Sequence, residues 1–367
     1  MEARLERETQ PFALSTRTIS YVGLVLLNVM LNLVTLTLYR FWGKTAIRRR
    51  LWAETQLLGE SFEYTGKGSE LFKGFLVAAV EVFLPIVLAY GAAQAFLPPA
   101  QAASAFAALY LIIGFLAYAA VYLTRRYQLS RTLWRGIRFG LDGSPFAFAL
   151  FSYGQLMLIV LTLGWWAPAA QQRMARRIWR ETRYGDTRFT FGVDAGEALA
   201  GPTYKRFAIG WLLAAFGWIA AVAAIVAMAA PHLGDLRGGD ADPRRMAMLG
   251  GGVLAAVFAW LILASLAFLA YQVAAMRRTA ALVGFGEARF ALNARTLGVL
   301  WLGVSNLLLI VFSLGVLLPL TEIRVWRYIV KRLAVEGALS LEHVRQSEER
   351  GPRIGEGLAD GLDFGGV

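Results

Sequence analysis

The chain has 367 residues, no cysteine and a formal net charge of +12, and 57% of its residues are hydrophobic. Soluble domains are roughly 45–50% apolar, and here the apolar residues gather in runs near the ~20 residues that cross a bilayer. The composition therefore indicates a polytopic membrane protein. The absence of cysteine excludes disulfides, thiolate metal sites and cysteine nucleophiles. With only two histidines and no catalytic motif, we expect no metal, no cofactor and no enzymatic activity.

Seven apolar stretches follow one another and predict an all-α polytopic membrane fold with internal repeats. A polar leader at 1–17, lying on the membrane surface, precedes an integral-membrane domain over 18–345. A glycine-rich, acidic tail at 346–367 is expected to be flexible. The stretches run over 18–39, 74–97, 102–124, 146–167, 207–230, 249–275 and 297–320.

One phrase recurs along the chain: an apolar stretch, an arginine-rich helix, a glycine and a short alternating run. The clearest copy runs from Leu31 to Gly68, a second from Leu158 to Gly192, and a degenerate third from Leu307 to Glu342. Weaker echoes follow Tyr122 and Tyr271. This repetition indicates a fold built by copying a membrane-plus-cytosolic unit.

Each alternating run predicts a short strand in a cytoplasmic connection. In the first copy a basic helix is predicted from Thr45 to Leu58, Gly59 ends it, and Phe62 and Tyr64 share one strand face. Single copies are too short to be stable, but five on one side of the membrane could pair into a small sheet or barrel. The alternative is that they are loops with membrane-anchoring aromatics. The other copies are Gly143 with Phe146 and Phe148, Gly185 with Phe189 and Phe191, Gly286 with Phe290 and Leu292, and Gly337 with Leu339 and Leu341.

Positive charge brings two topologies into conflict. If all seven stretches span, the basic segment 168–206 lies opposite the basic segment 40–73, against the bias of Lys and Arg toward the cytoplasm. If stretches 18–39, 146–167 and 297–320 are broken or re-entrant, every basic unit faces the cytosol, but their backbone then needs protein or a water-filled cavity around it. Seven conventional spans are the preferred model.

Three phrases carry a family resemblance: LTLYRFWGKTAIRRRLWAETQLLGESFEYTGKGSELFKGF from Leu36, NLLLIVFSLGVLLPLTEIRVWRYIVKRL from Asn306, and GEGLAD from Gly355. They resemble the YjgN family (DUF898) of bacterial inner-membrane proteins, over most of the chain. The resemblance implies a multi-pass protein of the bacterial inner membrane. It carries over no catalytic residue, because the function of the family is unknown. The middle copy has LGWWAP in place of LYRFWGK, which puts in doubt a role for Lys44 shared by all repeats.

The strongest single candidate for function is Glu81, within the second stretch. Ionisable residues in spans usually face a cavity or a partner, and burial would suit Glu81 to proton coupling. The alternative is a place near the interface or a pair with an arginine. Four amides could line a polar path, although interhelical hydrogen bonds are the favoured interpretation. They are Asn28, Asn32, Gln155 and Asn306.

A basic, aromatic collar follows the first stretch. It is typical of a topology anchor, and its functional alternative is a site for anionic lipid headgroups. The collar comprises Trp42, Lys44, Arg48, Arg49, Arg50 and Trp52. The expected partners are therefore the bilayer and its anionic headgroups. Nucleic acid is not expected, because no nucleic-acid-binding motif occurs.

The leading functional hypothesis is transport or binding of a small solute or lipid. Internal repeats, broken apolar segments and an acidic residue at membrane depth are features of transporters. The alternative is a non-transporting scaffold whose basic cytoplasmic units bind anionic lipid or a protein partner. The scaffold predicts a dry, well-packed interior.

Overall fold

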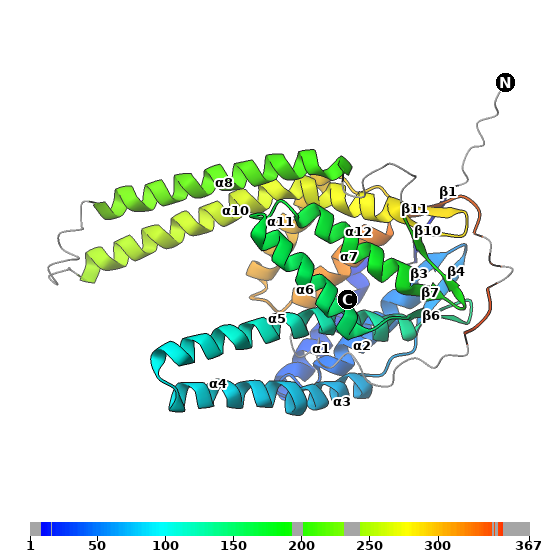
Figure 1. Cartoon of the computed structure of the whole chain (residues 1–367). Helices are drawn as coiled ribbons and strands as arrows, with labels where there is room; N and C mark the ends of the chain where they lie inside the picture. Colours follow the sequence, from blue (N-terminus) through cyan, green and yellow to red (C-terminus); the bar gives the residue numbers. More distant parts are fainter. Residues whose placement is uncertain are drawn as a thin grey trace, which may run out of the picture.

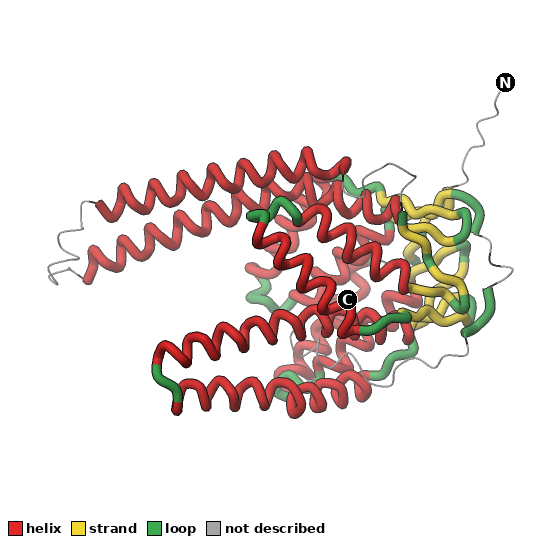
Figure 2. The backbone as a smooth tube through the Cα atoms, in the orientation of Figure 1, coloured by secondary structure: helices red, strands yellow, loops and turns green. Residues whose placement is uncertain are grey.

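The computed structural model describes residues 9–15, 17–192, 201–230, 243–339, 341 and 344–347. In this part of the chain, helices occupy one side of the molecule and all the strands gather at one end (Figures 1 and 2). Two long helical hairpins project away from the strands, and the shorter helices lie closer to them (Figure 1).

One unit occurs five times in the described residues: a strand, a helical hairpin and a second strand that pairs with the first. Units one, three and five have short hairpins. Unit one comprises β1 (Thr9–Pro11), β2 (Ala13–Leu14), η1 (Thr18–Tyr21), α1 (Val22–Val34), α2 (Arg40–Glu54) and β3 (Thr55–Leu57). Unit three comprises β6 (Ile137–Leu141), α6 (Pro145–Leu161), α7 (Ala167–Glu181) and β7 (Thr182–Tyr184). Unit five comprises β11 (Ala288–Leu292), α11 (Thr296–Phe312), α12 (Leu318–Val330) and β12 (Leu333–Glu336).

Units two and four have long hairpins, and these contain the helices that can cross a membrane. Unit two comprises β4 (Glu60–Tyr64), α3 (Gly68–Ala78), the π-helical turn η2 (Ala79–Phe83), α4 (Leu84–Phe96), α5 (Pro99–Ser130) and β5 (Thr132–Trp134). Unit four comprises β8 (Thr187–Arg188), β9 (Thr190–Phe191), α8 (Gly201–Ala229), α10 (Pro243–Leu282) and β10 (Val283–Phe285). Within the described residues, four helices are long and apolar enough to span: Gly68–Phe96, Pro99–Ser130, Thr203–Ala229 and Met246–Leu282.

Two bridging strands close the sheet into a barrel. β1 pairs with β12, and β2, one residue further on, pairs with β3. In the same way β8 pairs with β7, and β9 pairs with β10. The strands pair as two sheets, β1-β12-β11-β10-β9 and β2-β3-β4-β5-β6-β7-β8, and the sheets are joined where β1 continues into β2 and β8 into β9, each after a one-residue break. Each of the four bridging pairs is antiparallel. A closed barrel has no free edge at which another chain could add a strand.

Glycines in tight turns set the strand boundaries. Gly59 and Gly136 have φ of 78° and 76°, and the residues before them, Leu58 and Arg135, also have positive φ. Two consecutive positive φ values are typical of the two-residue hairpin turns that match the strand twist. The helix predicted from Thr45 to Leu58 therefore ends at Glu54, because Thr55–Leu57 pairs across the turn as β3.

Two of the predicted strands are wrong. Phe146 and Phe148 lie in α6, whose first turn is capped by Ser144, and the strand of that copy is β6, after Gly136. Leu339 and Leu341 lie outside the strands, because β12 precedes Gly337. The leader expected over 1–17 contains regular structure at residues 9–14. They form β1 and β2, which complete the barrel between β12 and β3. The tail predicted over 346–367 lies outside the described residues beyond Ser347.

The three short hairpins turn through the same elbow. A hydroxyl oxygen at the end of the first helix accepts a hydrogen bond from the backbone N–H four residues later. The two residues that directly follow the hydroxyl-bearing residue have positive φ, and the chain reverses its direction there. The pairs are Thr35 with Tyr39 at 2.9 Å, Thr162 with Trp166 at 3.0 Å, and Ser313 with Leu317 at 3.1 Å.

The structure does not confirm the model of seven conventional spans. The helices before them have 13, 17 and 17 residues, or about 20–25 Å at 1.5 Å per residue, which is short of the ~30 Å hydrocarbon core. The basic segments 40–73 and 168–206 both contribute strands to the one barrel. They therefore lie at the same end of the molecule, as the alternative topology requires.

Candidate functional site

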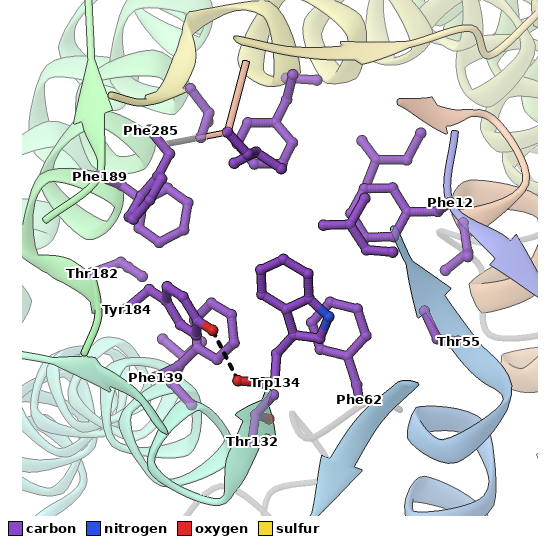
Figure 3. A pocket seen from close by; sticks show the side chains of 18 of the residues that line it. Phe12, Thr55, Phe62, Thr132, Trp134, Phe139, Thr182, Tyr184, Phe189 and Phe285 are labelled. Atoms are coloured by element: carbon purple, nitrogen blue, oxygen red, sulfur yellow. Dashed lines mark hydrogen bonds between the residues drawn. The ribbon is translucent and has the colours of Figure 1, made fainter. Parts of the chain in front are cut away.

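An apolar cavity of about 340 Å³ lies inside the barrel (Figure 3). Side chains of a strand point alternately to its two faces, so every second residue of these short strands reaches the interior. Aromatic rings from several strands point toward the same space (Figure 3). Because all five units contribute to it, the cavity is a property of the assembled barrel and of no single repeat.

Equivalent positions of the five units build the wall in layers. Each unit contributes one phenylalanine from its opening segment, either within β4, β6 or β11 or at the one-residue break between β1 and β2 or between β8 and β9. These residues are Phe12, Phe62, Phe139, Phe189 and Phe290. The first residues of the closing strands form a second layer: Thr55, Thr132, Thr182, Val283 and Leu333. The next inward residues of four closing strands form a third: Leu57, Trp134, Tyr184 and Phe285.

Aromatic contacts fix the wall. The rings of Phe139 and Tyr184 are 4.7 Å apart, those of Phe189 and Phe285 are 5.0 Å apart, and that of Trp134 lies 5.6 Å from Tyr184. Tilted pairs at these distances are stabilising beyond the burial of their area. Packed pairs of aromatic rings thus form much of the wall.

The polar side chains of the wall are already hydrogen-bonded. Thr132 Oγ1 accepts from Trp52 Nε1 at 2.9 Å, and Thr182 Oγ1 donates to the Ile178 carbonyl at 2.8 Å. The Tyr184 hydroxyl donates to the Trp134 carbonyl at 2.8 Å (Figure 3). Burial raises the pKa of Tyr184 to about 12, so this phenol stays protonated at neutral pH. The wall favours an apolar ligand over a charged one.

Helix ends form the floor of the cavity. The residue three positions before each closing strand lines it, one from each unit. These positions lie in the last turn of the second helix, where the helix enters the barrel. The five floor residues are Trp52, Leu129, Trp179, Ala280 and Val330.

The chain after β12 covers the opposite end. Leu339 and Leu341 line the cavity there. The backbone N–H of Asp186 donates to the Arg345 carbonyl at 3.0 Å, and the N–H of Arg345 donates to Asp186 Oδ1 at 3.2 Å. The hydrogen bond from Arg345 lowers the pKa of the Asp186 carboxyl. This segment therefore connects unit five to the β7–β8 turn across the barrel.

Glu81 lies apart from the cavity, on an exposed position of η2. Among the described residues it has no ion pair, so the arginine partner considered for it is not found there. The π-helical turn has a local cause: Pro85 has no N–H to donate to the carbonyl four residues earlier, and its ring would clash with that carbonyl.

The predicted amides do not meet at one site. Asn28, Gln155 and Asn306 each lie seven positions before the elbow hydroxyl of their own hairpin. Asn28 Nδ2 donates to the Gly43 carbonyl of α2 at 3.3 Å, and Gln155 Oε1 accepts from Trp166 Nε1 at 3.0 Å. These bonds agree with the favoured interpretation that the amides hold helices together. Neither these three nor Asn32 lines the cavity.

The collar residues are dispersed over two faces of α2. Arg48 is fully buried and donates to the Tyr64 hydroxyl at 3.4 Å. Trp52, one turn later on the same face, belongs to the cavity floor. An exposed collar of all six residues is therefore excluded, because 3.6 residues per turn bring positions 48 and 52 to the buried side.

The remaining collar residues lie nearer the surface. Trp42 is 39% exposed, and Lys44 is half-buried. Arg49 Nη2 donates to the Gly66 carbonyl at 2.8 Å. Arg50 pairs with Glu54 at 3.1 Å and lies 4.6 Å from the Tyr21 ring centre. Arg50 thus has partners within its own unit.

The sequence pattern predicts no site at the cavity, although part of the signal for it is present. Phe62, Phe189 and Phe290 were recognised as strand residues following glycines. The sequence pattern does not show that the strands close into a barrel. Phe12 precedes the first apolar stretch, and Phe139 follows Gly136, whereas the predicted strand of that copy follows Gly143. Only alignment of all five units reveals a ring of phenylalanines.

A protein-family model described as "Bacterial protein of unknown function (DUF898)" matches residues 9–361. The match covers all five units of the described chain. No curated protein and no solved structure matches the chain.

Proposed function

The chain belongs to the DUF898 family of bacterial proteins of unknown function, and we propose that it is a multi-pass inner-membrane protein that binds the apolar chain of a membrane lipid inside its barrel. The observation that carries this proposal is the aromatic cavity of about 340 Å³. Ligand pockets in proteins are mostly apolar and occupy on the order of 300–1,000 Å³.

The position of the cavity supports a lipid chain as its occupant. The second helix of each hairpin runs directly into the barrel, and the last turns of these helices form its floor. The hairpins of units two and four contain the candidate membrane spans. The nearest reservoir of apolar molecules is therefore the hydrocarbon around those hairpins. A hydrocarbon chain forms no hydrogen bond with the wall. The threonine and tyrosine hydroxyls of the wall already have hydrogen-bond partners within the protein.

Transport of a polar solute has less support. Such a path needs polar groups in a continuous line, and the described amides lie in separate hairpins. Glu81, on an exposed position of η2, does not line the cavity. A scaffold without a ligand would need no aromatic cavity. In this proposal the protein lies in the inner membrane and its barrel lies in the cytosol. The reason is that arginine-rich segments of membrane proteins favour the cytoplasmic side.

Photolabelling tests the proposal. The intact protein in phosphatidylcholine vesicles receives a fatty acid carrying a diazirine near its methyl end, is irradiated, and is mapped by peptide mass spectrometry. We expect adducts on the barrel segments 132–139 and 182–189. Adducts confined to the apolar helices in the wild type would contradict the proposal.

Two variants of neighbouring residues provide a matched control. Leu57 points into the cavity, whereas Gln56 lies on the other face of β3. Leu57→Trp fills part of the cavity and is expected to reduce the barrel adducts severalfold, while Gln56→Trp leaves them unchanged. Equal labelling of the two variants would show that the chain binds outside the barrel. Retained thermal unfolding temperatures confirm that both variants fold.

A further inference from the structure

The elbow of unit three lies among the apolar helices. The indole N–H of Trp211 donates to the Leu163 carbonyl at 2.9 Å, and Trp211 belongs to α8, which is long and apolar enough to span a membrane. Around this bond, Leu161 and Leu163 are 78% and 76% exposed, and exposed apolar side chains that gather in one place mark contact with a membrane or a partner. Helix α7 therefore begins beside the hydrocarbon layer and ends at the barrel.

Three arginines form the exposed face of α7: Arg173, Arg176 and Arg180. Spacings of three and four residues keep them within about 60° of the helix circumference. Among the described residues none of the three has an ion pair or a hydrogen bond to an acceptor. The guanidinium of Arg173 lies 4.5 Å from the ring centre of Trp166, toward the elbow. This face is thus a row of cations that lack an acceptor in the described fold.

Other arginines of the short hairpins have carboxylate partners. In units one and five, Arg50 and Arg327 converge on Glu54 at 3.1 and 3.5 Å. In α7 itself, Arg177 pairs with Glu181 at 3.2 Å. These arginines hold the fold together, whereas the row on the exposed face points away from it. Its anionic partner therefore lies outside the described part of the chain.

The row lies at the depth of phospholipid headgroups. In unit two, about 20 residues cross the hydrocarbon from Pro99, and its edge then lies near Ala119, about 20 Å before the barrel. Strands β5 and β7 belong to one sheet, so positions equally far before them lie at similar depth. Arg173 and Arg176 precede Thr182 by nine and six positions, which is about 6–11 Å beyond the hydrocarbon edge. Side chains on a helix lean toward its N-terminus, here toward the membrane.

We propose that the exposed face of α7 binds the anionic headgroup of a phospholipid in the cytoplasmic leaflet. Guanidinium groups form charge-assisted, often bidentate hydrogen bonds with phosphate oxygens, and the acyl chains of the lipid lie against the exposed elbow residues Leu161 and Leu163. The inference rests on the membrane placement in the proposed function. It concerns a surface separate from the barrel cavity, because none of the three arginines lines that cavity.

Native mass spectrometry of the full chain in a non-ionic detergent tests this inference. Phosphatidylglycerol and phosphatidylcholine with identical acyl chains are titrated, and bound lipids are counted. Because each arginine near an anionic headgroup strengthens binding about fivefold, we expect the wild type to prefer phosphatidylglycerol by at least about tenfold. The triple variant Arg173→Gln/Arg176→Gln/Arg180→Gln should lose this preference. The matched control removes the same charge from exposed barrel positions and should keep it: Arg135→Gln/Arg188→Gln/Arg289→Gln.

Each other outcome overturns the inference. An unchanged preference in the α7 variant places the headgroup elsewhere, and an equal loss in both triple variants shows a response to net charge. Displacement of phosphatidylglycerol by inorganic phosphate identifies a site for free anions. Absence of a preference in the wild type rejects the lipid and leaves an acidic protein as the partner to seek.

Two further comparisons keep the test decisive. If the triple variant does not fold, Arg176→Gln is compared with its neighbour Arg177→Gln, and a preference lowered about fivefold is expected in Arg176→Gln alone. Leu57→Trp, which fills part of the barrel cavity, should keep the preference for phosphatidylglycerol. A loss of preference in Leu57→Trp would assign the headgroup contact to the barrel, whereas failure of the barrel photolabelling leaves the α7 face unaffected.

Discussion

The indole N–H of Trp326 donates to Thr55 Oγ1 over 3.3 Å, although the two residues are 271 positions apart. Trp326 belongs to unit five and Thr55 to unit one, so this bond lies where the last repeat meets the first. The stack of Trp326 on Trp52 lies beside it. Together with the pairing of β1 with β12, these contacts turn a linear series of repeats into a ring.

Removing the Trp326 side chain should therefore weaken the whole barrel. Trp326→Ala leaves a cavity at the closure point and is expected to cost about 3–5 kcal/mol of unfolding free energy. Trp326→Phe keeps an aromatic stack, loses the hydrogen bond, and is expected to cost about 1 kcal/mol. Denaturant unfolding in detergent, followed by near-ultraviolet circular dichroism, measures both. Equal costs for the two variants would show that the stack contributes little.

The same substitution should have opposite effects at two glycines of one hairpin. Gly315 in the elbow has φ of 83°, and Gly303 lies within α11, with open space around the position of a Cβ at both. Gly315→Ala should cost roughly 1–2 kcal/mol, because a Cβ disfavours the left-handed backbone. Gly303→Ala should be neutral or stabilise by up to about 1 kcal/mol. Thermal unfolding of the two variants decides, and a destabilisation by Gly303→Ala as large as that by Gly315→Ala would refute the backbone explanation.

Low pH should release the chain segment around Arg345, which follows β12 and covers one end of the barrel. The hydrogen bond from the Arg345 N–H holds the pKa of Asp186 below its ordinary value of 3.8. A carboxyl with a lowered folded pKa contributes stability above its unfolded pKa and loses it as the pH falls through the folded pKa. Hydrogen exchange at the Arg345 amide should therefore accelerate, after correction for intrinsic rates, below about pH 4.

The control for this pH dependence is Asp186→Asn, which cannot ionise. Its Arg345 amide should exchange faster than that of the wild type at neutral pH, and its protection should show no step on acidification. A step of the same size in the variant would assign the pH dependence to another group.

The barrel predicts that all basic units lie on the same side of the membrane. Because the chain has no cysteine, a single introduced cysteine reports its own location. Thr187→Cys and Ser61→Cys, both in barrel strands, should react with an impermeant maleimide only after cell lysis. Gln101→Cys, near the tip of the first long hairpin, should react in intact cells. Labelling of Thr187→Cys in intact cells while Ser61→Cys stays protected would contradict the structure, because both strands belong to one barrel.

Local sequence determined much of this protein. The length and apolarity of 74–124 and 207–275 indicate two crossing hairpins, since spanning helices satisfy their own backbone and need only enough apolar residues. The repeat of basic helix, glycine and alternating aromatics indicates the units and, in three copies, their phenylalanines. These properties depend on neighbours in the chain, and a pattern of neighbours is what a sequence displays.

The tertiary structure alone decided the elbows and the barrel. A straight span and a helix that turns back at Thr162 or Ser313 have the same apolar composition, and they differ only in which backbone groups are hydrogen-bonded at the turn. The strands have two to five residues, too few to be stable until neighbours from other units pair with them. Phe12 and Phe290 come together with three other phenylalanines only when β1 reaches β12, and the cavity exists because that ring closes.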